Sequence, residues 1–255
     1  MPASPCPAPP SASPPTPPPV DAAKQERAWK AECARLDAER EKQLAARQVE
    51  WQKREAQRAA REKRQHQIEL WEASGVEARH RGRQLGELER HGQWAAAFEA
   101  ACGIVDAGGI MALLGDRGNG KTQLAVMLIR RFCLALKACR YVRCREIGLC
   151  VRRAFDPGAE VTEREALEQF ASPRLLVVDE LQELAATDFS RDTLTYILDH
   201  RYGRCVPTVL IANTTEDSFK KIVGPAVVDR LREGGGVIMF DWPSFRGQAP
   251  DARQE

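Results

Sequence analysis

The sequence lacks any long apolar run. No stretch approaches the roughly 18 consecutive apolar residues that a membrane-spanning helix needs, which argues against a helical membrane protein. Residues 1–20 also have no apolar core of the kind found in secretory signal peptides, because Pro, Ser and Ala dominate them. We therefore expect a cytoplasmic protein that has no membrane partner.

Closely paired cysteines are absent as well. The eight cysteines are scattered along the chain with no C-x-x-C pair, and the four histidines do not group with them. Zinc sites normally show tight paired spacing, so the pattern argues against a zinc site. A reduced protein is the simpler interpretation.

Neither sign of charge predominates. Lys and Arg number 38 against 36 Asp and Glu, which gives a net charge of +2. This balance is uninformative about partners, so any affinity for nucleic acid has to come from local patches.

Residues 21–72 contain neither Gly nor Pro, and strong helix formers dominate them. The segment therefore predicts a long charged helix. At about 100° per residue, a sector about 80° wide collects most of its apolar side chains, namely Ala22, Trp29, Cys33, Leu36, Leu44 and Trp51. Arg40, Arg47 and Arg58 interrupt this face, so it is not a strict heptad seam. Two interpretations remain open: a solvated helix with weak self-association, or a partner-docking helix whose two Trp residues enter a groove.

Both ends of the chain are predicted to be disordered tails. Residues 1–20 are rich in proline and nearly free of charge, and such a segment cannot bury enough apolar surface to fold. Residues 247–255 form the second tail.

The rest of the chain predicts one α/β domain of ordinary size. Residues 73–107 read as a linker and a leading helix, the helix over Leu85–Cys102. Short apolar segments then alternate with amphipathic ones over residues 108–246, which predicts a five-stranded parallel sheet with right-handed crossovers. Strands are predicted at 110–114, 141–143, 175–179, 208–213 and 237–240, and helices at 122–135, 146–155 and 194–202.

The strongest motif fits the pattern G-x-x-x-x-G-K-[ST]. Its glycines let backbone N–H groups point at phosphate oxygens. Lys121 reaches the β and γ phosphates, and the Thr122 hydroxyl binds Mg²⁺. An apolar strand precedes the loop and an amphipathic helix follows it. The sequence thus predicts a site for ATP and Mg²⁺ built by Gly115, Asp116, Arg117, Gly118, Asn119, Gly120, Lys121 and Thr122.

Two further apolar strands end in polar residues. Leu175–Val178 is followed by Asp179 and Glu180, at the sheet edge where open α/β sheets bind ligands. Asp179 is expected to hold the Mg²⁺ shell, and Glu180 to orient and deprotonate the attacking water. Asn213 ends the strand that begins near Thr208, where it can hydrogen-bond the attacking water or the γ-phosphate.

Arg230 follows a short helix that Pro225 can open at its first turn. We predict that it reaches the γ-phosphate of a neighbouring subunit as an arginine finger, which implies a homo-oligomer on ATP binding. The alternative is a solvated helix end that favours cations.

With these elements in order, residues 72–246 resemble the DnaC-type replicative helicase loaders, a AAA+ group shared with the IstB-type transposition helper ATPases. The segments that carry the resemblance are Leu175–Glu180, Asn213-Thr214, Asp229–Arg232 and Phe240–Arg246. The resemblance implies that Asn213 is the sensor-1 residue, that Arg230 is the finger acting in trans, and that Arg246 is a second phosphate-sensing arginine. Ser74–Arg81 is similar to the stretch that leads into this family's ATPase domain near the adenine.

The same group has a DNA-facing helix after its second strand, with a basic residue and an aromatic three positions on. Arg152 and Phe155 match, with Arg153 beside them, and such a pair can hold single strands without sequence preference. The alternative is that Phe155 is a core residue. The chain departs from the group in its charged N-terminal helix and at Asn119, where Thr or Val is more usual. As in the group, no C-terminal lid domain is expected.

These features together predict an ATPase that loads a replicative DNA helicase onto single-stranded DNA, encoded by a phage or prophage. One alternative is a transposase-assisting ATPase, which a basic helix-turn-helix domain at the N-terminus would favour. Another is an adaptor that holds ATP without turnover, which Glu180 beside Asp179 argues against. A nucleotide kinase is least favoured, because no acceptor-binding insertion is evident.

Overall fold

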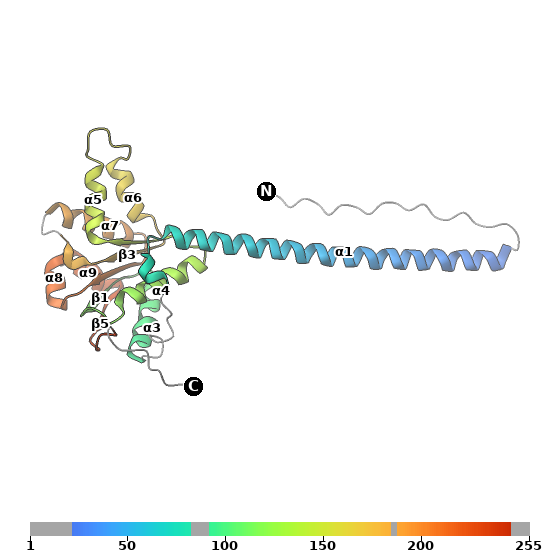
Figure 1. Ribbon diagram of the computed structural model, residues 1–255, viewed down its shortest axis with the longest axis horizontal. Helices are drawn as coiled ribbons and strands as arrows, with labels where there is room; N and C mark the ends of the chain where they lie inside the picture. The colour runs from blue at the N-terminus through green and yellow to red at the C-terminus, as the bar shows by residue number, and fades with distance from the viewer. Residues whose placement is uncertain (1–21, 83–91, 185–187, 246–255) are drawn as a thin grey trace. The chain divides into compact units, whose positions relative to one another are not determined.

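The computed structural model of the protein describes most of the chain (Figure 1). The described residues are 22–82, 92–184 and 188–245. Both predicted tails and the start of the helix predicted from Leu85 lie outside them. No helix in the described ranges combines the length and the apolar character that crossing a bilayer requires.

The chain divides into two units, Met1–Gln65 and His66–Glu255. Helix α1, Ala22–Ala73, begins in the first unit and ends in the second, which confirms the predicted long charged helix. Exposed pairs spaced four residues apart support it, namely Lys30–Glu26, Arg54–Glu50 and Arg58–Glu62. Each such pair contributes about 0.3–0.5 kcal/mol. The helix stops where Gly75 takes a left-handed backbone with φ of 80°.

A five-stranded parallel sheet forms the centre of the second unit, in the order β2-β3-β4-β1-β5. The strands are β1 Ile110–Gly115, β2 Cys139–Arg143, β3 Leu175–Asp179, β4 Thr208–Ala212 and β5 Gly236–Phe240. Because all strands run in one direction, their carboxyl ends meet at one edge. The α/β fold with a five-stranded parallel sheet is confirmed.

Alternate residues of the strands face two helical layers (Figure 1). Met111 and Leu113 of β1 belong to the core shared with α3, Gly92–Asp106, and α4, Lys121–Leu134. Ile110, Ala112 and Leu114 belong to the core on the opposite face. The helices of that core are α5 Cys144–Arg153, α6 Glu163–Ala171, α7 Asp188–Tyr202, α8 Glu216–Val223 and α9 Pro225–Gly234.

Several elements differ from the prediction. Helix α5 begins and ends earlier than the predicted 146–155, so Phe155 lies in the turn after it. Helices α6 and α8 were not predicted. Each carries an N-cap that the sequence contains: Thr162 with Glu165 forms a capping box, and Thr215 accepts from the backbone of Ser218. Such Ser/Thr caps mark helix starts.

A fully buried arginine, Arg201, links several elements around the core on the opposite face of the sheet. The Arg201 guanidinium on α7 donates to the carbonyls of Ala171, Pro173 and Pro207 at 3.0, 2.8 and 2.6 Å and to the Thr208 hydroxyl at 2.8 Å. Burial lowers the pKa of Arg201 to about 9. These bonds hold the end of α6 and the starts of β3 and β4 in one place.

Candidate nucleotide-binding site

The phosphate-binding loop connects β1 to α4 at the carboxyl edge of the sheet. Gly115, Gly118 and Gly120 all have positive φ, of 128°, 93° and 93°. A side chain at Gly120 would place its Cβ 2.7 Å from the Trp94 indole nitrogen, and that indole N–H donates to the Gly120 carbonyl at 3.3 Å. Only glycine combines this backbone with this close approach. The loop conformation therefore follows directly from the motif.

Lys121 closes the loop from inside. Its ammonium group donates to the carbonyls of Gly115 and Asp116 at 2.8 and 2.5 Å, and the residue is only 4% exposed. A buried cation in a ring of backbone amides is a phosphate-recognition arrangement. The lysine thus lies within the loop, and its contact with the β and γ phosphates stays a prediction.

Asn119 joins the loop to the chain that follows β5. Its side-chain amide donates to the carbonyls of Phe240 and Trp242 at 3.0 and 2.6 Å, and the Trp242 indole N–H donates back to the Asn119 carbonyl at 3.0 Å. The Phe245 backbone amide also donates to the Gly118 carbonyl at 3.0 Å. Thr or Val could not make the two amide bonds, so this departure from the family pattern has a structural role.

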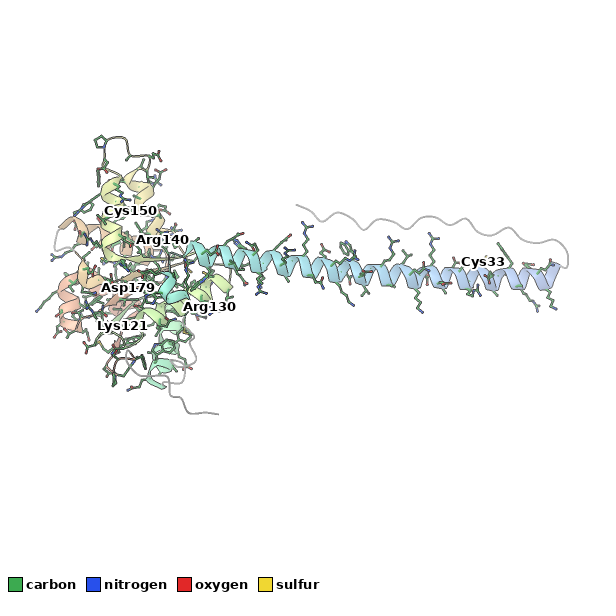
Figure 2. All side chains as sticks on the ribbon, viewed as in Figure 1. Cys33, Lys121, Arg130, Arg140, Cys150 and Asp179 are labelled. Carbon is green, nitrogen blue, oxygen red and sulfur yellow. The ribbon has the colours of Figure 1, made fainter. Side chains whose placement is uncertain are left out.

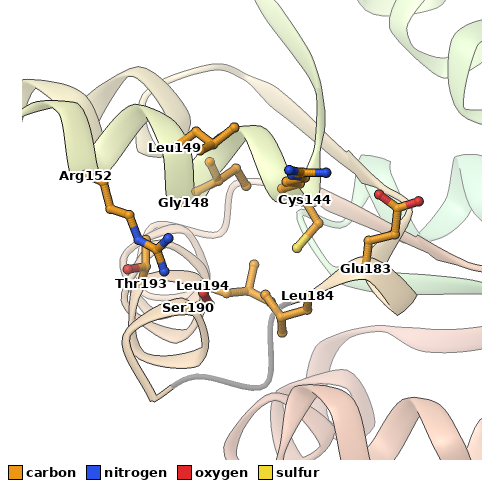
Figure 3. A pocket seen from close by; sticks show the side chains of 11 residues that line it. Cys144, Gly148, Leu149, Arg152, Glu183, Leu184, Ser190, Thr193 and Leu194 are labelled. Atoms are coloured by element: carbon orange, nitrogen blue, oxygen red, sulfur yellow. The ribbon is translucent and has the colours of Figure 1, made fainter.

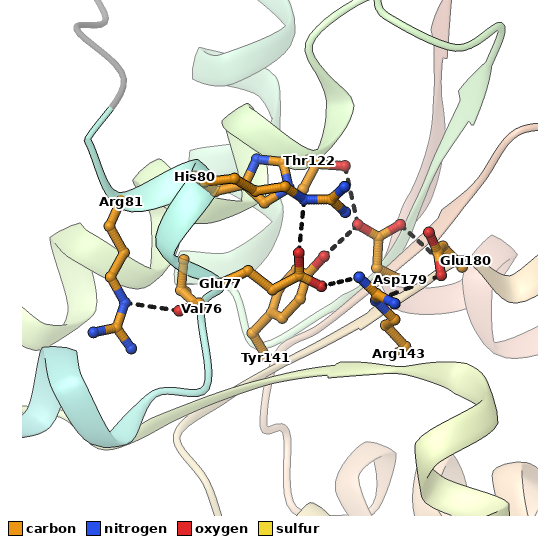
Figure 4. Close-up of polar contacts among 10 residues, drawn as sticks. Val76, Glu77, His80, Arg81, Thr122, Tyr141, Arg143, Asp179 and Glu180 are labelled. Carbon is orange, nitrogen blue, oxygen red and sulfur yellow. Dashed lines mark hydrogen bonds and ion pairs between the residues drawn. The ribbon is translucent and has the colours of Figure 1, made fainter.

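Thr122 and Asp179 lie side by side next to the loop (Figure 4). The Thr122 hydroxyl donates to the Asp179 carboxylate at 3.0 Å, and the Tyr141 hydroxyl and the Glu180 amide donate to it at 2.7 Å each. Burial and the nearby carboxylate raise the pKa of Tyr141, which keeps its hydroxyl a donor. A hydroxyl and a carboxylate oxygen are hard donors that fit Mg²⁺.

Glu180 follows β3 in a left-handed conformation with φ of 58°. Burial is the main reason that its pKa is raised, and the negative charge of Glu183 adds to the effect, while Arg143 lowers it. The Arg143 guanidinium lies 3.6 Å from the Glu180 carboxylate. A carboxyl group with a raised pKa at a ligand-binding edge is typical of a general base.

A polar network reaches Glu180 from the segment after α1 (Figure 4). The Glu77 carboxylate is bound by Arg143 at the end of β2 and by Arg79 of the short helix α2, Ala78–Arg81, the latter at 2.6 Å. Sequence analysis did not identify Glu77 or Arg143 as site residues. The only signal for Arg143 was its place at the end of a strand that leads into the site.

A cavity of about 310 Å³ unites the predicted groups. The residues that line it are Arg79, His80, Arg117, Gly118, Gly120, Lys121, Thr122, Gln123, Asp179, Glu180, Gln182 and Asn213, whereas Gly115, Asp116 and Asn119 of the predicted site do not line it. The Asn213 backbone N–H donates to the side-chain oxygen of Gln182 at 3.0 Å, which fixes the end of β4 against the segment after β3. The stretch after α1 thus lines the cavity through Arg79 and His80, whereas Arg81 donates to the Val76 carbonyl at 2.7 Å.

Arg230 does not line this cavity. Its guanidinium pairs with Asp199 at 2.8 Å, donates to the Ala226 carbonyl at 2.7 Å and stacks over the Tyr202 ring at 5.7 Å. The position of Arg230 therefore gives no support for a contact with the nucleotide of its own chain. Its role toward a neighbouring subunit stays a prediction. Arg246 lies outside the described residues.

A second cavity, of about 440 Å³, lies between α5 and α7 (Figure 3), and of the two predicted DNA-contacting residues only Arg152 is among the residues that line it. Arg152 lines it, and its guanidinium lies 5.3 Å from the ring of Phe189 on α7. Phe155 meets the same ring edge-on at 6.2 Å and is 56% exposed. The alternative that Phe155 is a core residue is therefore wrong, while DNA contact stays a prediction.

The chain was compared with known proteins. A family model described as IstB-like ATP binding protein matches residues 92–249, more than half of the chain. The replicative helicase loader DnaC of Escherichia coli strain K12 is 25% identical over 135 residues, 52% of this chain and 55% of DnaC. DnaC of Buchnera aphidicola subsp. Acyrthosiphon pisum is 26% identical over 133 residues, 52% of this chain and 54% of that protein. The chain spans about half the length of these curated relatives.

Solved structures give the same fold at low identity. A crystal structure of the DnaC helicase loader matches with a TM-score of 0.55 and 18% identity, covering 64% of this chain and 99% of that one. A crystal structure of DnaI matches with a TM-score of 0.53 and 18% identity, covering 67% and 94%. Domain III of the replication initiation protein DnaA from Thermotoga maritima gives 0.54 at 15% identity, covering 66% and 70%. The chain therefore has a AAA+ fold, and by its matched residues it belongs to the family of IstB-like ATP-binding proteins.

Proposed function

We propose that the protein is an ATP-dependent loader that places a replicative DNA helicase on single-stranded DNA in the cytoplasm. The observation that carries the proposal is the cavity that brings Lys121, Thr122, Asp179 and Glu180 together. Relatives named as replicative helicase loaders match 52% of this chain. ATP binding would assemble subunits and engage DNA, and hydrolysis would release the helicase.

In the proposed reaction this chain binds the phosphates and activates water. Lys121 and the loop amides hold the phosphate oxygens, and Thr122 with Asp179 would hold Mg²⁺, which neutralises phosphate charge when bound. Glu180 takes a proton from the attacking water, and Asn213 orients that water. Glu180 also favours turnover over the alternative of an adaptor that only holds ATP.

Arg230 completes the proposed site from a second copy of the chain. In its own subunit it pairs with Asp199 and stacks over the ring of Tyr202, both on α7. In a ring or spiral of subunits, it would act on the γ-phosphate of the neighbour's nucleotide. An arginine in trans stabilises the transition-state charge. Arg246 is proposed as a further phosphate sensor.

The proposed DNA contact lies at α5. Arg152 carries the charge for a phosphate, and the exposed ring of Phe155 offers a stacking face for a base. Phe189 holds both side chains close to one another. This arrangement suits a single strand bound without sequence preference.

The main alternative is a transposase-assisting ATPase. That function was expected to come with a helix-turn-helix domain, and residues 22–73 instead form one uninterrupted helix. This observation argues against the transposase-assisting alternative over residues 22–73.

The test is complex formation with purified partners. The full chain with ATP is mixed with the replicative helicase of its host, or with a transposase from the same genome, and the mixtures are separated by size-exclusion chromatography. We expect co-elution with the helicase alone. Co-elution with the transposase alone would overturn the proposal in favour of the transposition helper.

A further inference from the structure

One face of α1 carries a row of arginines interrupted by a tryptophan. At about 100° per residue, these side chains share a sector about 80° wide: Arg40, Arg47, Trp51, Arg54, Arg58 and Arg61. We call this set the arginine–tryptophan face. At about 1.5 Å per residue it extends for about 32 Å along the helix.

No acidic residue falls in that sector anywhere between Trp29 and Gln65. All six side chains of the face are exposed, Trp51 by 37%, and side chains project from the helix along its length (Figure 2). Between Trp29 and Gln65 the acidic residues lie on the other sides of the helix, so the balanced overall composition hides a strip of one sign along this stretch. This strip is a local positive patch.

The arginines are available for a ligand. Arg54 pairs with Glu50 at 2.7 Å and Arg58 with Glu62 at 2.9 Å, but both partners of each pair are mostly exposed. Exposed pairs contribute about 0–1 kcal/mol and exchange readily. The other three arginines make no ion pair with any residue in the described ranges.

The chemistry of this face fits a polyanion with flat rings. A helix that enters a protein groove presents apolar anchors at i, i+3, i+4 and i+7, and between Arg40 and Arg61 the sector offers only Trp51 as an anchor. Arginines that follow a backbone of phosphates, with an aromatic ring that stacks on a base, are the features of single-strand binding. The apolar positions Trp29 and Leu36 at the other end of α1 remain for a protein partner.

We infer that the arginine–tryptophan face of α1 is a second binding surface for single-stranded DNA, separate from α5. The strand's phosphates lie along the arginines, and one base stacks on Trp51. The inference stands on α1 alone, so it does not depend on the proposed contact at Arg152 and Phe155.

The experiment compares two triple variants of the full chain. Arg47, Arg54 and Arg58 are changed to Gln in one. In the matched control, Lys42, Lys53 and Arg64 of the same helix, which point away from the face, are changed to Gln. Both variants lose the same charge, and Gln keeps the helix, which circular dichroism checks. Fluorescence anisotropy with labelled oligo-dT is measured across a salt series.

We expect the face variant to bind more weakly and its salt dependence to flatten by about 2 in slope, since each lost phosphate contact removes about 0.7. The control variant should match the parent protein. Trp51→Ala should weaken binding by about tenfold, because stacking contributes about 1–3 kcal/mol per base, whereas Trp29→Ala should not.

Equal losses in both triple variants would overturn the inference, because the effect would then come from net charge alone. Unchanged DNA affinity in the face variant, with complete loss in an Arg152→Ala/Phe155→Ala variant, would also overturn it and leave the proposed function standing. Loss of helicase binding in the face variant with unchanged DNA affinity would instead assign the face to a protein.

Discussion

At the scale of single residues, the proposed roles assign phosphate recognition and water activation to different side chains. Lys121 is enclosed by its own loop, while Glu180 lies after β3 with its carboxylate toward Arg143. We therefore expect the two residues to contribute to different steps. Substitutions at them should separate binding from turnover.

Lys121→Ala should abolish ATP binding, because it removes the cation that the loop holds for the phosphates. Glu180→Gln should keep ATP affinity and lower turnover by about 10²–10⁴-fold, the usual contribution of a general base. Binding is measured with a fluorescent ATP analogue and turnover by phosphate release. An equal loss of affinity in both variants would refute the assigned roles.

The pH dependence of turnover should reveal Glu180 as well. The base acts as a carboxylate, so turnover falls as the pH drops through its pKa. Because burial and Glu183 raise that pKa, the loss should begin at a higher pH than for an ordinary carboxyl group. Arg143 lowers the pKa of Glu180, so Arg143→Gln should raise that pKa and move the acid limb of the kcat–pH profile to higher pH.

Arg143→Lys is the control for that shift, since it keeps the positive charge and should leave the acid limb near that of the parent protein. A limb that stays in place in Arg143→Gln would show that Arg143 does not act on Glu180.

At the scale of secondary-structure elements, Arg201 joins α7 to α6, β3 and β4. Arg201→Met should lower the free energy of unfolding by about 3 kcal/mol or more, because it leaves several buried carbonyls without a donor. The exposed Arg204 gives the matched control. Arg204→Met should change the free energy of unfolding by less than about 0.5 kcal/mol. Urea unfolding followed by circular dichroism measures both, and similar losses would contradict the joining role.

Phe155, in the turn after α5, should matter for DNA and not for folding. Phe155→Ala removes an exposed ring, so the unfolding midpoint should be unchanged. The affinity for oligo-dT in the presence of ATP should fall about tenfold. Tyr196→Ala, which removes an exposed ring from α7, should leave DNA affinity unchanged. Unfolding of the Phe155 variant, or equal effects of both changes, would argue against a DNA contact there.

The central elements were predictable because their signals are local. Buried parallel strands are continuous apolar runs, so β1, β3 and β4 were found within a residue or so of their ends, and the glycines of the loop require one conformation. Helix α6 was missed although Thr162 and Glu165 form its cap, because a short helix gives weak periodicity. The Glu77–Arg143 link could not be predicted, since it joins residues far apart in sequence whose pairing depends on the folded sheet.

At the scale of the whole molecule, the account requires subunits to share active sites. Arg230→Ala should leave ATP affinity nearly unchanged, because the residue does not line its own cavity, but should lower hydrolysis where subunits assemble. Mixing Arg230→Ala with Lys121→Ala protein should restore part of the activity, because the second variant supplies an intact Arg230 to the first one's intact loop. No recovery in mixtures shown to co-assemble would assign Arg230 a role within its own subunit.

Helicase loading on a single-stranded DNA circle coated with single-strand-binding protein tests the central claim most directly. Unwinding of an annealed strand by a replicative helicase from the same organism is measured with the parent protein, Lys121→Ala or Glu180→Gln, each with ATP. We expect rapid unwinding with the parent protein and none with Lys121→Ala. With Glu180→Gln, the helicase should be recruited to the circle but should not unwind the annealed strand. Unwinding that is the same with and without the protein would contradict the claim that it is a helicase loader.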